Sequence, residues 1–282
     1  MKLKMIAAAV LAVASLPSMA AIANGTSGNG ELFLAVYDDV AKVSFTLDLG
    51  ARQNDFLTLG QQEAGYTNSW ALTGDANWAT FLSQVSVANL QWSVLASETT
   101  GAASQVGGQR LFTTVKQGEE AGLATFTNQL FSLGNGSTQL GTFFSAIQTT
   151  GTHGTVGQAL DFGINGSSVN ADTDAGNAYF GIPGSGPTLN GNATFSSGNA
   201  IGGSSNFYYL TRSGSDQLAS VAADQFNNSA NNGSFTLAQG ASGYGLTYTL
   251  AVAAVPEPGS LALMLAGVGA LGFVARRRRA VR

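Results

Sequence analysis

Three oxygen-bearing side chains, Asn170, Asp172 and Asp174, have the spacing best suited to bind a metal ion. They offer amide and carboxylate oxygens at every second residue, and Gly176 follows as a turn residue. Hard cations such as Ca²⁺ take oxygen ligands in this kind of loop. The pattern departs from the EF-hand, because its glycine falls one position late and Gly181 stands where a bidentate glutamate is needed. We therefore treat the three residues as a candidate calcium site, with a turn of solvated acids as the alternative.

The only histidine, His153, lies in a segment rich in glycine and threonine and is expected to be an exposed loop residue. A serine–histidine–aspartate relay needs a histidine held rigidly between its partners, and no G-x-S-x-G elbow supplies the serine. The chain has no cysteine, so zinc and other soft-ligand sites are excluded. Glu119 and Glu120 are adjacent, which suits a helix start better than a pair of opposed glycosidase carboxylates. These residues predict that the protein is not an enzyme and needs no cofactor, calcium apart.

Aromatic residues offer a second kind of binding chemistry, the stacking of sugar rings. Trp70, Trp78 and Trp92, together with Tyr208 and Tyr209, are the candidates for such a platform. Trp78 and Trp92 sit in periodic apolar contexts, and this favours core packing over a role in binding.

The C-terminal stretch has three parts in a fixed order: a Pro-Glu-Pro motif, an apolar segment and a basic cluster. Pro256 and Pro258 fix φ and lack an N–H group, so the backbone around Glu257 is extended and no helix runs through it. Residues 259–275 carry no charge. As a helix they span roughly 25 Å, just under the ~30 Å hydrocarbon core of a bilayer. Because positive charge stays cytoplasmic, the cluster predicts that the body faces outward. The cluster consists of Arg276, Arg277, Arg278 and Arg279.

Pro256-Glu257-Pro258, the apolar segment and the arginines together resemble the PEP-CTERM sorting signal of Gram-negative bacteria, a tail also known under an ice-binding-protein name. The resemblance covers about residues 255–280. It implies export, transient anchoring in the inner membrane and processing by an exosortase, an intramembrane cysteine transpeptidase linked to exopolysaccharide production. The partners it implies are therefore the exosortase, the inner membrane and the exopolysaccharide or matrix of a biofilm. The resemblance concerns the handling of the protein and leaves the role of the body open.

The N-terminus also predicts export. Two lysines precede an apolar run over residues 5–16, and Pro17 ends this run before several small residues. The run is too short to span a bilayer, so we interpret it as a signal peptide of the Sec pathway. Cleavage after Ala20 or after Ala23 satisfies the small-x-small rule, and the position of Pro17 favours Ala20. The expected organisation is a signal peptide over 1–20 (or 1–23), an exported body over 24–254, the sorting motif over 255–260, a transmembrane helix over 259–275 and a cytoplasmic basic tail over 276–282.

The exported body is acidic, sparsely charged and rich in glycine. Residues 24–254 carry five basic and fifteen acidic residues, a net charge of −10, which argues against nucleic acid or anionic lipid as a partner. Charged residues make up 10% of the whole chain, against about 25% in ordinary domains. The surface must therefore consist mainly of serine, threonine, asparagine, glutamine and glycine. Such a surface suits a hydrated matrix, and it suits an ordinary exported protein equally well.

Two patterns of apolar residues predict the elements of the body. Alternation predicts strands, and over 43–49 it is clean, so one face of that strand is expected to be buried and the other to face water. Helical spacing predicts helices, with Asp75 as the N-cap of the first. From 151 to 205 the chain predicts a long loop or short strands. The expected strands cover about 31–37, 43–49, 90–96, 110–115, 207–211, 234–237 and 245–252, and the expected helices cover 77–87, 119–133 and 138–148.

The predicted fold class is α+β, mainly antiparallel and sandwich-like, with two or three helices inserted between about 76 and 148. A signal helix precedes this domain and a single transmembrane helix follows it. The N-terminal hairpin and the last strand, 246–250, are expected in the same sheet system. A very short linker would then join the folded body to the sorting motif.

Three functions are compatible with these features. The first is a non-enzymatic surface or matrix protein that is delivered through its tail. The second is an exported binding module for polysaccharide or ice, although no regular array of threonine or alanine indicates an ice-binding face. The third is an ordinary single-pass, tail-anchored surface protein.

Overall fold

The structure is a computed structural model. It describes residues 22–23, 25–26, 28–102, 105–135, 140–153, 166–174, 176–181, 187–189, 191–253, 264 and 266–268. Its strands are β1 (Glu31–Asp38), β2 (Val43–Arg52), β3 (Tyr66–Ala71), β4 (Leu90–Glu98), β5 (Arg110–Thr114), β6 (Ser167–Ala171), β7 (Asn199–Ala200), β8 (Ser204–Thr211), β9 (Ala222–Gln225), β10 (Ser234–Gly240) and β11 (Gly243–Leu250). Its helices are α1 (Gln53–Leu59), α2 (Ala76–Leu82), α3 (Asn128–Asn135) and α4 (Leu140–Ile147), with 3₁₀ turns η1 (Val87–Asn89) and η2 (Glu120–Thr125).

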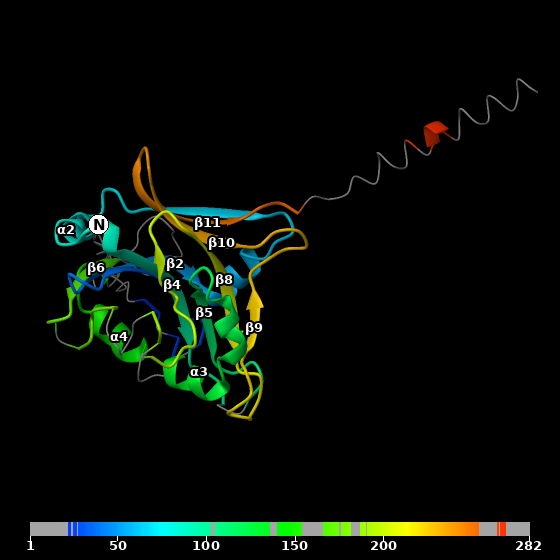
Figure 1. The fold of residues 1–282 in the computed structure, drawn as a ribbon, viewed down its shortest axis with the longest axis horizontal. Helices are drawn as coiled ribbons and strands as arrows, with labels where there is room; N and C mark the ends of the chain where they lie inside the picture. Colours follow the sequence, from blue (N-terminus) through cyan, green and yellow to red (C-terminus); the bar gives the residue numbers. More distant parts are fainter. Residues whose placement is uncertain are drawn as a thin grey trace, which may run out of the picture.

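The strands form one continuous antiparallel sheet in the order β3-β11-β10-β8-β5-β4-β1-β2-β6, with β7 paired to β4 and β9 paired to β8. The sheet bends at β8, because the first half of this strand pairs with β10 and the second half pairs with β5 and β9. Strands β10, β11 and β3 therefore lie across one end of the central strands (Figure 1). The prediction of a mainly antiparallel β fold is confirmed. A bent single sheet replaces the two stacked sheets expected of a sandwich.

The inner face of the bent sheet encloses an aromatic core. Phe56 of α1 lies at its centre, with its ring centroid 4.9 Å from that of Tyr248, 5.8 Å from that of Phe207 and 5.9 Å from that of Phe235. Burial of such rings is the largest favourable contribution to folding in a chain that has no disulfide. The inner core therefore ties α1 to the strands at the bent end of the sheet.

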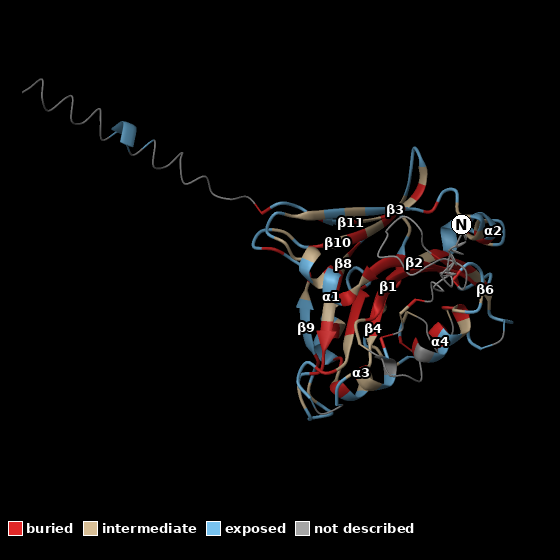
Figure 2. Cartoon of the chain, turned by 180° about the vertical axis from the view of Figure 1, so that it is seen from behind, coloured by how far each residue is buried: buried red, intermediate tan, exposed pale blue. Residues whose placement is uncertain are grey.

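The outer face of the central strands is covered by α3, α4 and the segments that follow them (Figure 1). Phe33 of β1 points to this side and packs against Phe143 and Phe144 of α4, with ring centroids 5.8 Å and 5.1 Å away. Strands β1 and β2 are consequently buried on both faces, as the burial colours of Figure 2 show. The prediction of a wet face on the second strand is wrong. Ser44, Thr46 and Asp48 are buried, and the segments on either side of β6 contact this face: Ser44 accepts the N–H of Phe180 (3.0 Å) and Thr46 lies 3.0 Å from Nε2 of His153.

Other predictions of elements were mostly confirmed. The hairpin β1–β2 and the last strand β11 belong to one sheet, as expected. Asp75 caps α2, because its carboxylate accepts hydrogen bonds from the backbone N–H groups of Asn77 (2.7 Å) and Trp78 (3.0 Å). The helix predicted over 119–133 is divided into η2 and α3. The sequence patterns did not indicate α1 and β3. The N-cap residue of α1 makes no side-chain capping bond, and the side-chain oxygen of the distant Asn29 instead accepts the N–H of Asn54 in the first turn (2.8 Å).

Candidate functional site

The body ends in a hydrogen-bonded clamp around the chain that leads to the tail. The side-chain amide of Asn228 donates to the carbonyl of Ala251 (2.7 Å). That of Asn231 donates to the carbonyls of Ala251 (3.3 Å) and Val252 (3.1 Å). Two asparagines thus hold the backbone beyond the last residue of β11 by side-chain donors.

The local sequence explains how the two asparagines are positioned. They lie in a turn that is closed by the bridge between Asn227 and Asn232. The side-chain oxygen of Asn228 accepts from the backbone N–H groups of Ala230 (3.1 Å) and Asn231 (2.8 Å), an Asx turn that directs its amide nitrogen towards the chain that follows β11. Asn228 therefore organises the turn and holds the outgoing chain at the same time.

The opposite side of the clamp is the loop before β3. Its residue Glu63 accepts the backbone N–H of Ala253 with its carbonyl (3.0 Å) and the hydroxyl of Ser229 with its carboxylate (2.7 Å). Gly65 in this loop has φ +73°, and a Cβ there would lie 2.7 Å from the carbonyl oxygen of Leu250. We call Glu63, Asn228 and Asn231 the exit clamp. It fixes the chain as far as Ala253.

The residues that come after the exit clamp are those that the comparison with known families recognises. A family model, described as the PEP-CTERM protein-sorting motif, matches residues 254–279. The tail carries the PEP-CTERM sorting motif. Comparisons with curated proteins and with solved structures gave no match. The assignment therefore covers the tail, and the family of the body is not identified.

The PEP-CTERM residues predicted from the sequence all fall inside the matched range. Pro256, Glu257, Pro258 and the arginines 276–279 lie outside the described residues. Of the predicted transmembrane segment the structure describes Met264 and residues 266–268, which have helical backbone. Within the described part of the chain, no helix has the length and apolarity needed to cross a membrane.

The candidate calcium residues lie on β6 and the turn after it. Asn170 is 2% exposed, and its side-chain oxygen accepts the hydroxyl of Ser168 (2.9 Å) on the covered side of the sheet. Asp172 and Asp174 are exposed in the turn, where the Asp174 carboxylate accepts the N–H of Ala171 (2.8 Å). Among the described residues, no group of three or more acidic, histidine or cysteine side chains is placed to hold a metal. Calcium binding stays a prediction, and Asn170 is already engaged inside the fold.

His153 is not the exposed loop residue that the sequence predicts. It is fully buried, with its Nε2 3.0 Å from Oγ1 of Thr46, and Thr46 in turn lies 2.7 Å from Oγ of Ser168. Gly166 covers the ring so closely that a Cβ there would lie 2.9 Å from Nδ1. Burial lowers the pKa of His153 to about 4, and the charge of Asp75 opposes this shift only in part. The histidine is neutral at pH 7 and acts as a buried structural residue.

Two buried carboxylates on the outer face were not singled out from the sequence. Glu31 is 3% exposed and accepts the N–H of Ala23 (2.9 Å), and Asp48 is 5% exposed and accepts the N–H of Gly50 (2.8 Å). Burial raises the pKa of Asp48 to about 7, and the charge of Glu31 adds to this effect, while Gly50 and Arg52 oppose it. Burial raises the pKa of Glu31 as well. Asp48 therefore titrates near neutral pH. The only sequence signal was its place on an alternating strand.

The tryptophans pack in the core, as the periodicity favours. Trp70, Trp78 and Trp92 are at most 3% exposed, and the indole nitrogen of Trp70 donates to the carbonyl of Leu49 (2.9 Å). Tyr208 is also buried. Tyr209 is partly exposed, but the other four rings are buried and cannot stack on a sugar, so the candidate platform does not form.

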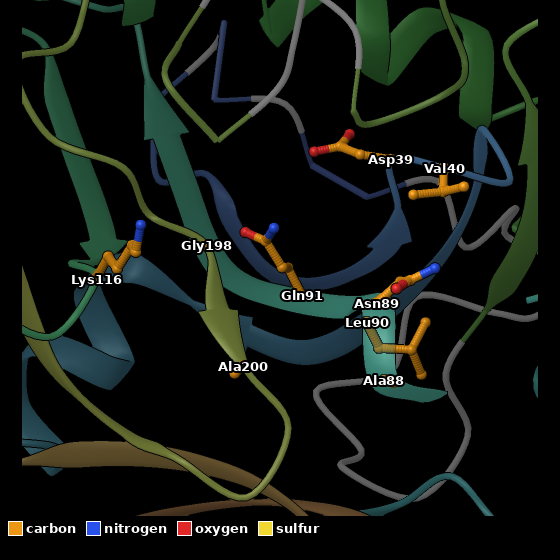
Figure 3. Close-up of a pocket in the computed structure, with 9 residues that line it drawn as sticks. All are labelled: Asp39, Val40, Ala88, Asn89, Leu90, Gln91, Lys116, Gly198 and Ala200. Atoms are coloured by element: carbon orange, nitrogen blue, oxygen red, sulfur yellow. The ribbon is translucent and has the colours of Figure 1, made fainter. Parts of the chain in front are cut away.

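An open pocket of about 390 Å³ lies beside the turn between β1 and β2 (Figure 3). Its wall includes that turn, η1, the start of β4, Lys116 and the segment around β7. No sequence pattern indicated this pocket, because its residues come from four separate parts of the chain. The only local signal was the acidic turn at 38–39.

Proposed function

We propose that the chain is an exported protein whose body is delivered to the cell surface or the extracellular matrix by its PEP-CTERM tail, after processing by an exosortase. The observation that carries this proposal is the match over residues 254–279, which begins directly after Ala253, where the described part of the body makes its last hydrogen bond. Export and sorting follow from the motif, and the finer steps of the route are proposals.

The tail is proposed to act in the inner membrane. Residues 259–275 span the bilayer as a helix, and Arg276–Arg279 stay on the cytoplasmic side, so the body is periplasmic before processing. Pro256-Glu257-Pro258 then stands at the outer membrane–water boundary. The prolines keep this backbone extended, and the charge of Glu257 keeps it out of hydrocarbon, so a membrane protease has access to it.

The exit clamp sets how far the motif can move from the body. Pro256 lies three positions after Ala253, and an extended chain of three steps reaches about 10 Å. The proposed cut therefore takes place close to the surface that carries Asn228 and Asn231. The residues held by the clamp lie between the last strand, which ends at Leu250, and the motif. The body therefore does not have to unfold for this cut.

The packing of the N-terminus supports signal-peptide cleavage after Ala20. Ile22 is fully buried in the outer cluster, and its carbonyl accepts the side-chain amide of Gln148 (3.0 Å). Ala23 exchanges hydrogen bonds with Glu31 through its carbonyl and its N–H group. Cleavage after Ala23 would remove these contacts. We therefore propose that Sec export yields a mature chain that begins at Ala21.

The proposed role of the released body is non-enzymatic and associated with exopolysaccharide or biofilm matrix. Its sparsely charged, glycine-rich surface supports this, since hydrogen bonding to a hydrated polymer does not depend on strong charge. An exported polysaccharide- or ice-binding module is the alternative.

Calcium binding through Asp172 and Asp174 remains a separate proposal. Millimolar Ca²⁺ would raise Tm of the wild type and leave Tm of the Asp172→Ala/Asp174→Ala variant unchanged.

The sorting proposal is tested by intact mass and cell fractionation in a host with and without its exosortase. The mature protein is expected to lack residues beyond about 259 only when the enzyme is present. Pro256→Ala/Glu257→Ala/Pro258→Ala should block processing. Replacement of Arg276–Arg279 by glutamine should make the position of the motif relative to the bilayer less well defined, and cleavage should therefore be less complete. A full-length tail that persists beside an active exosortase would leave an ordinary tail-anchored surface protein.

A further inference from the structure

The open pocket beside the β1–β2 turn carries hydrogen-bonding groups that the sorting route does not use. Figure 3 shows the side chain of Gln91, from the start of β4, between Lys116 on one side and Asp39 on the other. The volume of about 390 Å³ falls within the range of small-molecule sites, roughly 300–1,000 Å³. The pocket is part of the folded body, so binding at this site does not depend on the tail.

The amide of Gln91 is held in one orientation. The hydroxyl of Tyr37 donates to its Oε1 (3.0 Å), and Tyr37 is itself fully buried. Burial raises the pKa of Tyr37, so this hydroxyl keeps its proton and remains a donor. Gly198 leaves the space for the contact, because a Cβ there would lie 2.1 Å from the Tyr37 oxygen and 3.0 Å from Oε1 of Gln91. Because its Oε1 is engaged by the hydroxyl of Tyr37, Gln91 presents its Nε2 as a donor to the pocket.

The acceptor of the pocket is held in a similar way. The hydroxyl of Tyr179 donates to Oδ1 of Asp39 (3.0 Å), which leaves Oδ2 as an acceptor. The preceding residue, Asp38, is 1% exposed, and its carboxylate accepts the N–H groups of Val40 (2.8 Å) and Ser86 (3.1 Å). Although burial opposes it, these backbone hydrogen bonds lower the pKa of Asp38. One ionised buried carboxylate therefore joins the turn after β1 to the loop before η1, and the pocket wall is built in advance of any ligand.

The charges that line the pocket are balanced and already partnered. Lys116 lies 2.9 Å from Glu119 in a half-exposed ion pair, and Asp39 accepts from Tyr179. Asp39 and Lys116 are the charged members of the lining, and their formal charges cancel. A ligand therefore gains little by carrying a charge of its own. It gains more from a group that donates to Asp39 and accepts from Gln91, and the hydroxyl group does both.

We propose that this pocket binds an uncharged, hydroxyl-rich ligand of the size of about one or two sugar rings. Gln91 and Asp39 are the residues that recognise it, and Tyr37, Tyr179 and Gly198 position them. The chemistry of the pocket favours a neutral saccharide over a zwitterion or an anion, since the charge of Lys116 is already paired with Glu119 and the charges of the described lining residues cancel.

The test uses the purified full-length protein and four neutral disaccharides, maltose, cellobiose, lactose and sucrose, in calorimetric or NMR titrations. Diglycine serves as the zwitterionic probe and glucuronate as the anionic probe. At least one disaccharide should bind, with a Kd that stays the same between low and high salt because no ion pair forms. Binding of diglycine or glucuronate in preference to all four disaccharides, or no binding of any disaccharide, would overturn the proposed ligand class.

Variants locate the site. Gln91→Leu should weaken the binding of the best disaccharide about tenfold, the upper end of what one neutral hydrogen bond contributes. Tyr37→Phe keeps the buried ring and removes only the hydroxyl that orients Gln91, so it should weaken binding by a smaller factor. Gln129→Leu changes an exposed glutamine on α3, outside the pocket, and should bind like the wild type. Unchanged binding in both pocket variants, with wild-type Tm, would overturn the assignment of the site.

Discussion

The two faces of the bent sheet are stabilised in different ways. The inner core is a set of apolar and aromatic side chains packed around Phe56. The outer face contains an equally buried apolar cluster, and beside it lie polar side chains that are also buried: His153, Asp48 and Arg212. Arg212 donates to the carbonyl of Asn128 (3.0 Å) and to the hydroxyl of Ser132. The inner face therefore depends on burial and on hydrogen bonds of groups that do not titrate near neutral pH, such as the indole of Trp70, while the outer face also depends on which groups are protonated.

The largest expected effect tests the inner face. Phe56→Ala should reduce the free energy of unfolding by about 3–5 kcal/mol, because the ring packs against several aromatic rings of the core and its removal leaves a cavity. Urea unfolding at pH 5 and at pH 8 is the measurement, and the loss should be the same at both. Phe56→Leu, which keeps part of the volume, should cost less. A loss that depends strongly on pH would break the contrast between the faces.

The next effect belongs to the outer face at acid pH. The pKa of His153 is about 4 in the folded protein, against ~6.5 in an unfolded chain, so the unfolded state binds the proton first as pH falls. Stability should therefore decline between about pH 6.5 and pH 4, by about 3 kcal/mol in total. His153→Gln keeps a hydrogen-bonding group beside Thr46 and cannot titrate. The difference between variant and wild type isolates this residue.

For His153 the comparison is the free energy of unfolding of both proteins at several pH values. Below about pH 6.5 the curve of the wild type should fall towards or below that of His153→Gln. Parallel curves across the range from acid to neutral pH would show that the histidine is accessible to solvent, contrary to its burial.

Asp48 should show the opposite dependence on pH with an effect of similar size. Its pKa is about 7 in the fold and ~3.9 in an unfolded chain, so the folded state holds the proton longer as pH rises. Stability is fully present below about pH 4 and is lost as pH rises through about 7. Asp48→Asn should be more stable than the wild type at pH 8, by up to about 4 kcal/mol, and equal at pH 4. Thermal unfolding at the two pH values tests this, and a destabilised variant at pH 8 would contradict it.

The smallest effect concerns the exit clamp, which is held by hydrogen bonds around the buried Asn228. Asn228→Ala removes both the Asx turn and the bond to Ala251, and should cost about 1–2 kcal/mol. Asn231→Ala removes only the bonds to the carbonyls of Ala251 and Val252, and it should leave the free energy of unfolding within about 0.5 kcal/mol of the wild type. Hydrogen exchange of the Ala253 amide should nevertheless become faster in both variants, because the end of the chain opens locally. Unchanged exchange would show that Glu63 alone holds this end.

Some features were readable from the sequence because they depend on neighbouring residues. The prolines around Glu257 restrict the backbone locally, and the uncharged length of 259–275 and the arginines after it are properties of composition. The cap made by Asp75 depends on residues two and three positions later. The alternation in β1 and β2 indicated strands for the same reason. These local signals were sufficient for the tail, for the hairpin and for the class of fold.

The site in the body depended on distant residues. The pocket joins the β1–β2 turn to residues about 50 to 160 positions later, and Tyr179 reaches Asp39 across 140 positions. The sequence pattern of one segment does not show which distant segment will pack against it. The tyrosine beneath Gln91 also looked in the sequence like an ordinary member of an alternating strand.

The sequence by itself determined the sorting motif of the tail, since the Pro-Glu-Pro motif and the arginines after it are short stretches whose chemistry acts locally. Tertiary structure alone decided which polar residues are buried. Thr46, His153 and Ser168 form one contact although up to 122 positions separate them, and Ser44, Thr46 and Asp48 would face water if nothing covered β2. The physical reason is that alternation specifies two faces of a strand, while solvent exposure depends on what packs against each face.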